Sequence, residues 1–163
     1  MKSIITIAAI TALFSSSLFA CVMDGVGTGA LYTVPKQTFS VQLATHKALK
    51  QQKFSAAQGA RYDQKMMMLV YQLKQRMQGK LNPAIQGSWY LFETSEGHYL
   101  RLDINEGKLD IKQHEVPAGD VEDAILIDVD ALAAILQNQI NLEQAKQLGV
   151  IHLPQGIEGL LQS

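Results

Sequence analysis

The chain has 163 residues, of which 47% are hydrophobic and 18% charged, so it is long and apolar enough for one folded domain and is not wholly disordered. One cysteine excludes a disulfide framework and any metal site built from several thiolates. The formal net charge is -1, so the chain lacks the excess of Lys and Arg that is typical of nucleic-acid-binding proteins, and we expect no nucleic-acid partner.

Residues 1–20 have the pattern of a secretory signal peptide. Lys2 precedes an apolar stretch from Ile4 to Phe14, and three serines then lead to Leu18-Phe19-Ala20. The apolar stretch is shorter than the roughly 20 residues that a transmembrane helix needs, and no later segment supplies such a run. The sequence therefore predicts export, with removal of residues 1–20.

Cys21 has the only thiol, so in an exported protein it either remains a free thiol or is covalently modified. Its position directly after Leu18-Phe19-Ala20 resembles the bacterial lipobox, in which this cysteine is lipidated and becomes the mature N-terminus. The resemblance implies lipid attachment at Cys21, and Val22 in the next position implies the outer membrane. Ordinary cleavage after Ala20 is the alternative, because Phe19 stands where a small or aliphatic residue is usual. We expect a periplasmic location, with a membrane anchor if Cys21 is lipidated.

Charge divides the mature chain into two halves. Residues 21–87 contain nine Lys and Arg against two acidic residues, whereas residues 88–163 contain four against 13. The interpretation we prefer is that the basic segment packs on the acidic one within a single fold. In the alternative, basic residues of the first half face an anionic membrane surface: Lys36, Lys47, Lys50, Lys53 and Arg61.

The first third of the mature chain gives weak structural signals. Three glycines within five residues predict a flexible tether over residues 22–34. Phe39, Val41 and Leu43 alternate with polar residues, which favours a short edge strand, and residues 51–61 show no pattern and are expected to dock loosely. We therefore divide the chain into a signal peptide (1–20), a tether and basic segment (21–61) and a compact domain (62–163).

The clearest predicted helix runs from Tyr62 to Gln78. Its apolar residues fall at helical spacing on one face, and Gly79 is a suitable stop: Tyr62, Met66, Leu69, Val70, Leu73 and Met77. The run Met66-Met67-Met68 could form an adaptable lipid-contacting surface, but core packing with one partly exposed methionine is the simpler interpretation.

From Ser88 onward the period changes to that of strands. Residues 88–94, 99–104 and 108–112 predict an antiparallel meander, and residues 124–129 and 150–153 predict a fourth, central strand and a fifth. Asp130 and Asn141 are predicted to cap two short helices, and residues 157–161 begin a last helical turn. The expected fold class is α+β, a mostly antiparallel five-stranded sheet with helices packed on one face.

This order of elements resembles a sterol carrier protein (type 2) domain of the small bacterial kind, over about residues 62–163. The strand Asp123-Ala124-Ile125-Leu126-Ile127, the helices at 132–136 and 138–145, and the strand Gly149-Val150-Ile151-His152-Leu153 match the corresponding elements of that family. The family binds fatty acyl chains, sterols or other lipids in an apolar tunnel between sheet and helices, and it has no catalytic residues to carry over.

The resemblance implies a set of residues that could line such a tunnel, and a core without a tunnel would use the same residues. They come from the predicted helix, the sheet and the later helices: Met66, Leu69, Val70, Leu73, Trp89, Leu91, Leu100, Leu102, Ile104, Leu132, Ile135, Leu136 and Leu148.

No pattern of catalytic residues is present. The four histidines have no metal-ligand spacing, and no serine lies in a nucleophile elbow. We therefore expect no catalytic residues, no metal site and no cofactor. The leading hypothesis is non-catalytic binding of a lipid or other hydrophobic small molecule at the bacterial cell envelope. The alternative is an envelope protein–protein interaction module without a ligand cavity.

Overall fold

The computed structural model describes residues 34–59, 61–118, 123–154 and 157. The predicted signal peptide, Cys21, the tether up to residue 33 and all but the first residue of the last helical turn lie outside this part. The described elements are, in chain order, α1 (Thr38–Lys50), α2 (Tyr62–Met77), β1 (Gly87–Glu93), β2 (His98–Asn105), β3 (Lys108–Gln113), β4 (Ile125–Ile127), α3 (Val129–Leu136), α4 (Leu142–Leu148) and β5 (Ile151–His152).

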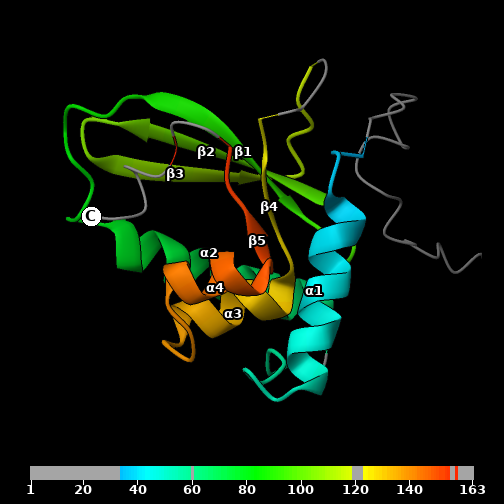
Figure 1. Cartoon of the computed structure of the whole chain (residues 1–163). Coiled ribbons are helices and arrows are strands. Elements are labelled where there is room, and N and C mark those ends of the chain that lie inside the picture. The colour runs from blue at the N-terminus through cyan, green and yellow to red at the C-terminus, as the bar shows by residue number, and fades with distance from the viewer. Residues whose placement is uncertain (1–33, 60, 119–122, 155–156, 158–163) are drawn as a thin grey trace, which may run out of the picture.

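The five strands form one sheet in the order β3-β2-β1-β4-β5. Every neighbouring pair is antiparallel except β1 and β4, which run parallel. Figure 1 shows the sheet as one layer with α2, α3 and α4 packed beneath it, while α1 stands beside β4 and α4. The predicted α+β class and the mostly antiparallel five-stranded sheet are confirmed.

Alternation along the strands decides which side chains face the helices. Leu100, Leu102 and Ile104 of β2 are buried in the main core, while Tyr99 joins Phe92 in a second cluster. The meander turns at Glu106 and Gly107, whose φ angles of 49° and 72° are both left-handed. Two left-handed central residues give the hairpin turn that matches strand twist, and glycine adopts this conformation without steric cost.

The predicted helix at residues 62–78 is α2, and its expected apolar face is the one that packs. Met66 and Leu69 are 4% and 3% exposed, whereas Met67 and Met68 both lie on the outer side. The core-packing interpretation predicted one partly exposed methionine in this run, whereas the structure has two exposed ones.

The caps of the two later helices differ in how well the sequence predicted them. Asn141 and Gln144 form the expected capping box of α4, which ends at the left-handed Gly149. The N-cap of α3 is Asp128 instead of the predicted Asp130. Asp128 accepts a hydrogen bond from the backbone N–H of Asp130, so the helix begins one residue after Asp128.

Residues 38–50 form a helix, so the expected edge strand at residues 39–43 is wrong. The physical reason is that Val41, Thr45 and Ala48 recur at helical spacing and are all buried. A three-residue alternation is too short to outweigh burial of a whole helix face.

The segment after α1 is also packed, contrary to the expected loose docking of residues 51–61. Phe54 and Ala57 are 5% and 8% exposed and belong to the main core. The backbone N–H of Ala57 donates to Asp130 Oδ1 at 2.8 Å, and that of Ser55 donates to Gln139 Oε1 at 2.8 Å. Burial of an aromatic ring therefore ties this segment to the sheet and to α3, while the place of a proteolytic domain boundary stays a prediction.

Candidate functional site

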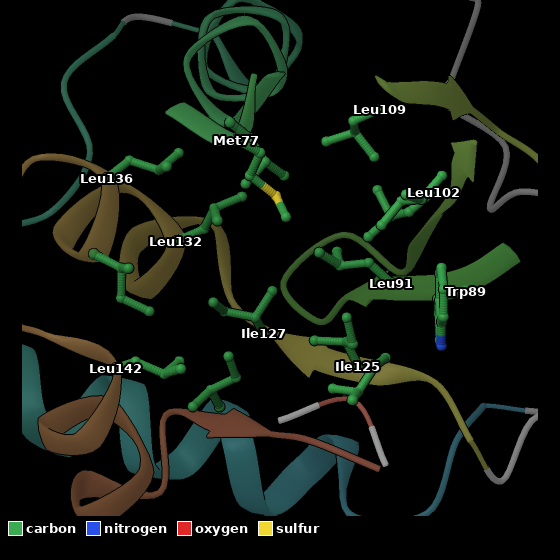
Figure 2. Close-up of a pocket in the computed structure, with 15 residues that line it drawn as sticks. Met77, Trp89, Leu91, Leu102, Leu109, Ile125, Ile127, Leu132, Leu136 and Leu142 are labelled. Carbon is green, nitrogen blue, oxygen red and sulfur yellow. The ribbon is translucent and has the colours of Figure 1, made fainter. Parts of the chain in front are cut away.

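An apolar cavity of about 90 Å³ lies between the sheet and the helices. Fifteen residues line it, and all have hydrophobic side chains. Figure 2 shows Met77, Leu132, Leu136 and Leu142 on the helix side, facing residues of the sheet such as Leu91 across the open space. A space of this chemistry favours apolar contents, because it offers no charged group.

Eight of the thirteen predicted lining residues contribute to this cavity: Leu73, Trp89, Leu91, Leu102, Ile104, Leu132, Ile135 and Leu136. Met66 and Leu100 instead line a separate space of about 140 Å³ near the start of α2. Leu69 is buried in the core, and Val70 and Leu148 pack against it, but none of these three lines either space.

Sequence reasoning missed seven lining residues: Met77, Leu109, Ile125, Ile127, Leu142, Ile151 and Ile157. The signal for most of them was present. Met77 lies on the apolar face of the predicted helix. Leu109 and Ile125 lie in predicted strands at positions whose side chains alternate toward the packed face. Ile157 was expected only as the first residue of a last helical turn, and no pattern placed it beside the cavity.

A second, open space adjoins the cavity. This groove measures about 400 Å³ and shares five wall residues with the cavity: Leu73, Met77, Ile135, Leu136 and Leu142. Polar residues, including Arg76, Lys80 and Asn138, form its rim. The cavity and the groove together form a site with an apolar interior and a polar outer part.

Arg76 determines the shape of this rim. Its guanidinium donates to the carbonyl oxygens of Ile135 and Leu136 at 3.1 and 2.9 Å, and to Asn138 Oδ1 at 2.6 Å. Carbonyls at a helix C-terminus lack intrahelical partners and attract cations. Arg76 thus joins the end of α2 to the end of α3 at the mouth of the groove.

Glu93 is a fully buried acid that the sequence analysis did not single out. Its Oε1 accepts hydrogen bonds from the backbone N–H and the hydroxyl of Ser95 and from the N–H of Val129, at 2.6–2.9 Å. Its Oε2 accepts from the Tyr62 hydroxyl at 2.8 Å and from the N–H of Glu96 at 3.0 Å. Glu93 therefore links the starts of α2 and α3 to the β1–β2 turn.

Asp128 lies near Glu93 at the start of α3. Burial raises the pKa of Asp128 from 3.8 to about 6, and the negative charges of Glu93 and Asp130 act in the same direction. The rings of Tyr62 and His98, and of His98 and His114, are 5.1 Å apart between centroids. These side chains form a polar cluster next to the apolar core, but they do not line the 90 Å³ cavity.

Among the described ion pairs, that of Lys74 with Asp110 at 3.4 Å joins the basic first half to the acidic second half. Other pairs lie within one half. Arg61 pairs with Asp63 at 2.6 Å, and Glu115 lies 3.8 Å from Arg101. Two acidic residues of the second half, Asp120 and Glu122, lie outside the described residues. Lys47, Lys50 and Lys53 form no ion pair in the described part of the chain.

Within the described residues, no group of three or more His, Cys, Asp or Glu is arranged to hold a metal ion. No helix in the same part of the chain combines the length and the apolar character needed to cross a membrane. No protein-family model matches the chain, and no curated protein matches it.

Proposed function

We propose that the protein binds a lipid or another hydrophobic small molecule without catalysis at the bacterial cell envelope. The observation that carries the proposal is the cavity of fifteen hydrophobic residues between the sheet and α2, α3 and α4. The envelope location is supported by the export pattern of residues 1–20 and the lipobox-like position of Cys21.

The volumes indicate how such a ligand would fit. Ligand pockets typically measure about 300 Å³ or more, so the 90 Å³ cavity accommodates only part of a ligand. The adjoining groove of about 400 Å³ provides the remaining space. An amphiphile would place an apolar segment between Leu91 and Leu132 and its polar end near Lys80 at the rim.

A substitution at the junction of cavity and groove tests this proposal. Leu136 lines both spaces, so Leu136→Phe adds a ring where a ligand would pass. Leu148→Phe makes the same change on α4 outside both spaces and serves as the matched control. Binding of a dansyl-labelled undecanoic acid, followed by fluorescence titration, should weaken about tenfold or more in Leu136→Phe and stay within twofold in Leu148→Phe.

Native mass spectrometry of the purified protein supplies an independent measurement. We expect a co-purified mass in the lipid range in the wild type and its loss in Leu136→Phe. Absence of any bound lipid, together with no saturable binding of the labelled acid, would remove the proposal and leave a plain core with a packing defect.

A further inference from the structure

Helix α1 exposes large apolar side chains on its outer face. Phe39 and Leu43 are 74% and 56% exposed, and their spacing of four residues places them one turn apart. Val41 and Ala48 on the opposite face are buried, so rotating the helix to bury Phe39 and Leu43 would expose them. Neighbouring exposed apolar side chains mark interaction surfaces more often than isolated ones do, so this face of α1 is a candidate contact surface.

The same outer face is basic. Lys47 and Lys50 are exposed and follow Leu43 by four and seven residues, which places all three on one side of the helix. Residues 34–61 contain five Lys and Arg and no acidic residue. Because Lys47 and Lys50 form no ion pair in the described structure, their charge is available to an external partner.

Helix α2 offers a useful contrast, because it also exposes apolar side chains. Met67, Met68 and Tyr71 are 64%, 49% and 64% exposed. There, however, an acidic residue is close to the cation, since Lys74 lies 3.4 Å from Asp110. The combination of exposed apolar groups with uncompensated positive charge distinguishes α1.

We propose that the outer face of α1 docks on an anionic lipid bilayer. Phe39 and Leu43 would enter the boundary between headgroups and acyl chains, and Lys47 and Lys50 would contact anionic headgroups. Helices that lie in a membrane interface combine aromatic and leucine side chains with lysines in this way. The docking does not depend on a ligand in the cavity, and the vesicle measurements below distinguish a bilayer from an acidic protein surface.

Vesicle sedimentation with the full chain tests the docking. The measured quantity is the ratio of the partition coefficient onto phosphatidylcholine vesicles containing one third phosphatidylglycerol to that onto phosphatidylcholine alone. Residues 1–33 contain one lysine and one aspartate, so their side chains carry no net charge. Their contribution to binding is therefore apolar, is the same for both lipids and cancels in the ratio. Each lysine near an anionic surface contributes roughly a fivefold preference, so we expect a ratio of about 25 that falls as salt is added.

Two pairs of variants separate docking from general charge. Lys47→Gln/Lys50→Gln should bring the ratio close to one. Lys74→Gln/Lys108→Gln removes the same amount of charge near strand β3, at the edge of the sheet. Helix α1 contacts β4, which two strands separate from β3, so this pair should leave the ratio within twofold. The substituted lysines are all exposed, and circular dichroism with a thermal melt checks that each variant is folded.

Apolar contacts are tested in the same assay. Phe39→Ser/Leu43→Ser should lower partitioning onto the anionic vesicles about tenfold, whereas Met67→Ser/Met68→Ser on α2 should leave it within twofold. A wild-type ratio near one, or an equal loss in both lysine pairs, overturns the proposal. Salt-sensitive binding to an acidic protein without any preference between the vesicles would also overturn it and assign the surface to a protein partner.

Discussion

Strand β1 contributes to two regions between the sheet and the helices, an apolar cavity and a polar cluster around Glu93. Trp89 and Leu91 line the apolar cavity, and Glu93, two residues farther along the same face, is fully buried among hydrogen-bond donors. Five hydrogen bonds hold the Glu93 carboxylate and link the starts of α2 and α3. At the cavity, apolar contacts pack the ends of those helices on the sheet, and the exposed pair of Lys74 with Asp110 at 3.4 Å lies outside it. The polar end therefore fixes the positions of the helices, while the cavity end can adjust to its contents.

The largest effect is expected at the polar end. Glu93→Ala would leave the buried N–H of Val129 and the partly buried N–H of Glu96 without their acceptor, and an unsatisfied buried group costs about 1–3 kcal/mol. We expect the free energy of unfolding to fall by about 3–5 kcal/mol, measured by urea denaturation at pH 7. Glu96→Ala, an exposed neighbour in the same turn, should change it by about 0.5 kcal/mol or less. A loss below about 1 kcal/mol in Glu93→Ala would show that these bonds do not fix the helices.

The second effect has the opposite sign. Because burial raises the pKa of Asp128 to about 6, its charge destabilises the folded state, and stability falls as the pH rises from about 4 through 6. Asp128→Asn keeps an oxygen for the cap bond to Asp130 but has no charge. We expect this variant to be more stable than wild type by roughly 2–3 kcal/mol at pH 7.5 and equal to it near pH 4. Urea midpoints at the two pH values measure the difference.

Asp103 provides the control for this pH dependence. A hydrogen bond from Ser88, with those from Lys112 and Arg101, lowers its pKa to about 2, so its charged form favours the folded state. Asp103→Asn should therefore lose stability at pH 7.5 and lose less as the pH falls toward 2. If Asp128→Asn and Asp103→Asn shifted stability in the same direction at pH 7.5, burial would not be the cause of the raised pKa of Asp128.

The two regions also differ in how far the sequence predicted them. Leu91, Leu102 and Leu132 were expected on the packed face because strand alternation and helical spacing show which face is apolar, while the expectation of a space there came from the family resemblance. Glu93 could not be found in this way. Its burial depends on donors from Tyr62, Ser95 and Val129, which are far apart in the sequence and meet only after the fold has formed.

Helix α1 was predicted incorrectly for a related reason. Three alternating residues around Val41 fit a strand, and local periodicity cannot tell such a run from one helical turn. The helix is favoured by tertiary burial of Val41, Thr45 and Ala48, together with packing of Phe54 just beyond it. The order of elements from α2 onward was predictable because each has a longer pattern or a cap, as at Asn141.

The smallest effect is expected at the mouth of the groove, where Arg76 donates hydrogen bonds that join the end of α2 to the end of α3. Arg76→Met keeps an apolar stem but removes the bonds to the carbonyls of Ile135 and Leu136 and to Asn138. These groups are exposed and can bind water instead, so the free energy of unfolding should fall by only about 1 kcal/mol. Lys80→Met, a matched change on the same rim, should alter it by less than about 0.5 kcal/mol. Hydrogen exchange should show faster exchange in the last turn of α3 in Arg76→Met alone. Equal exchange in both variants would mean that apolar packing, without Arg76, is sufficient to hold the cavity end together.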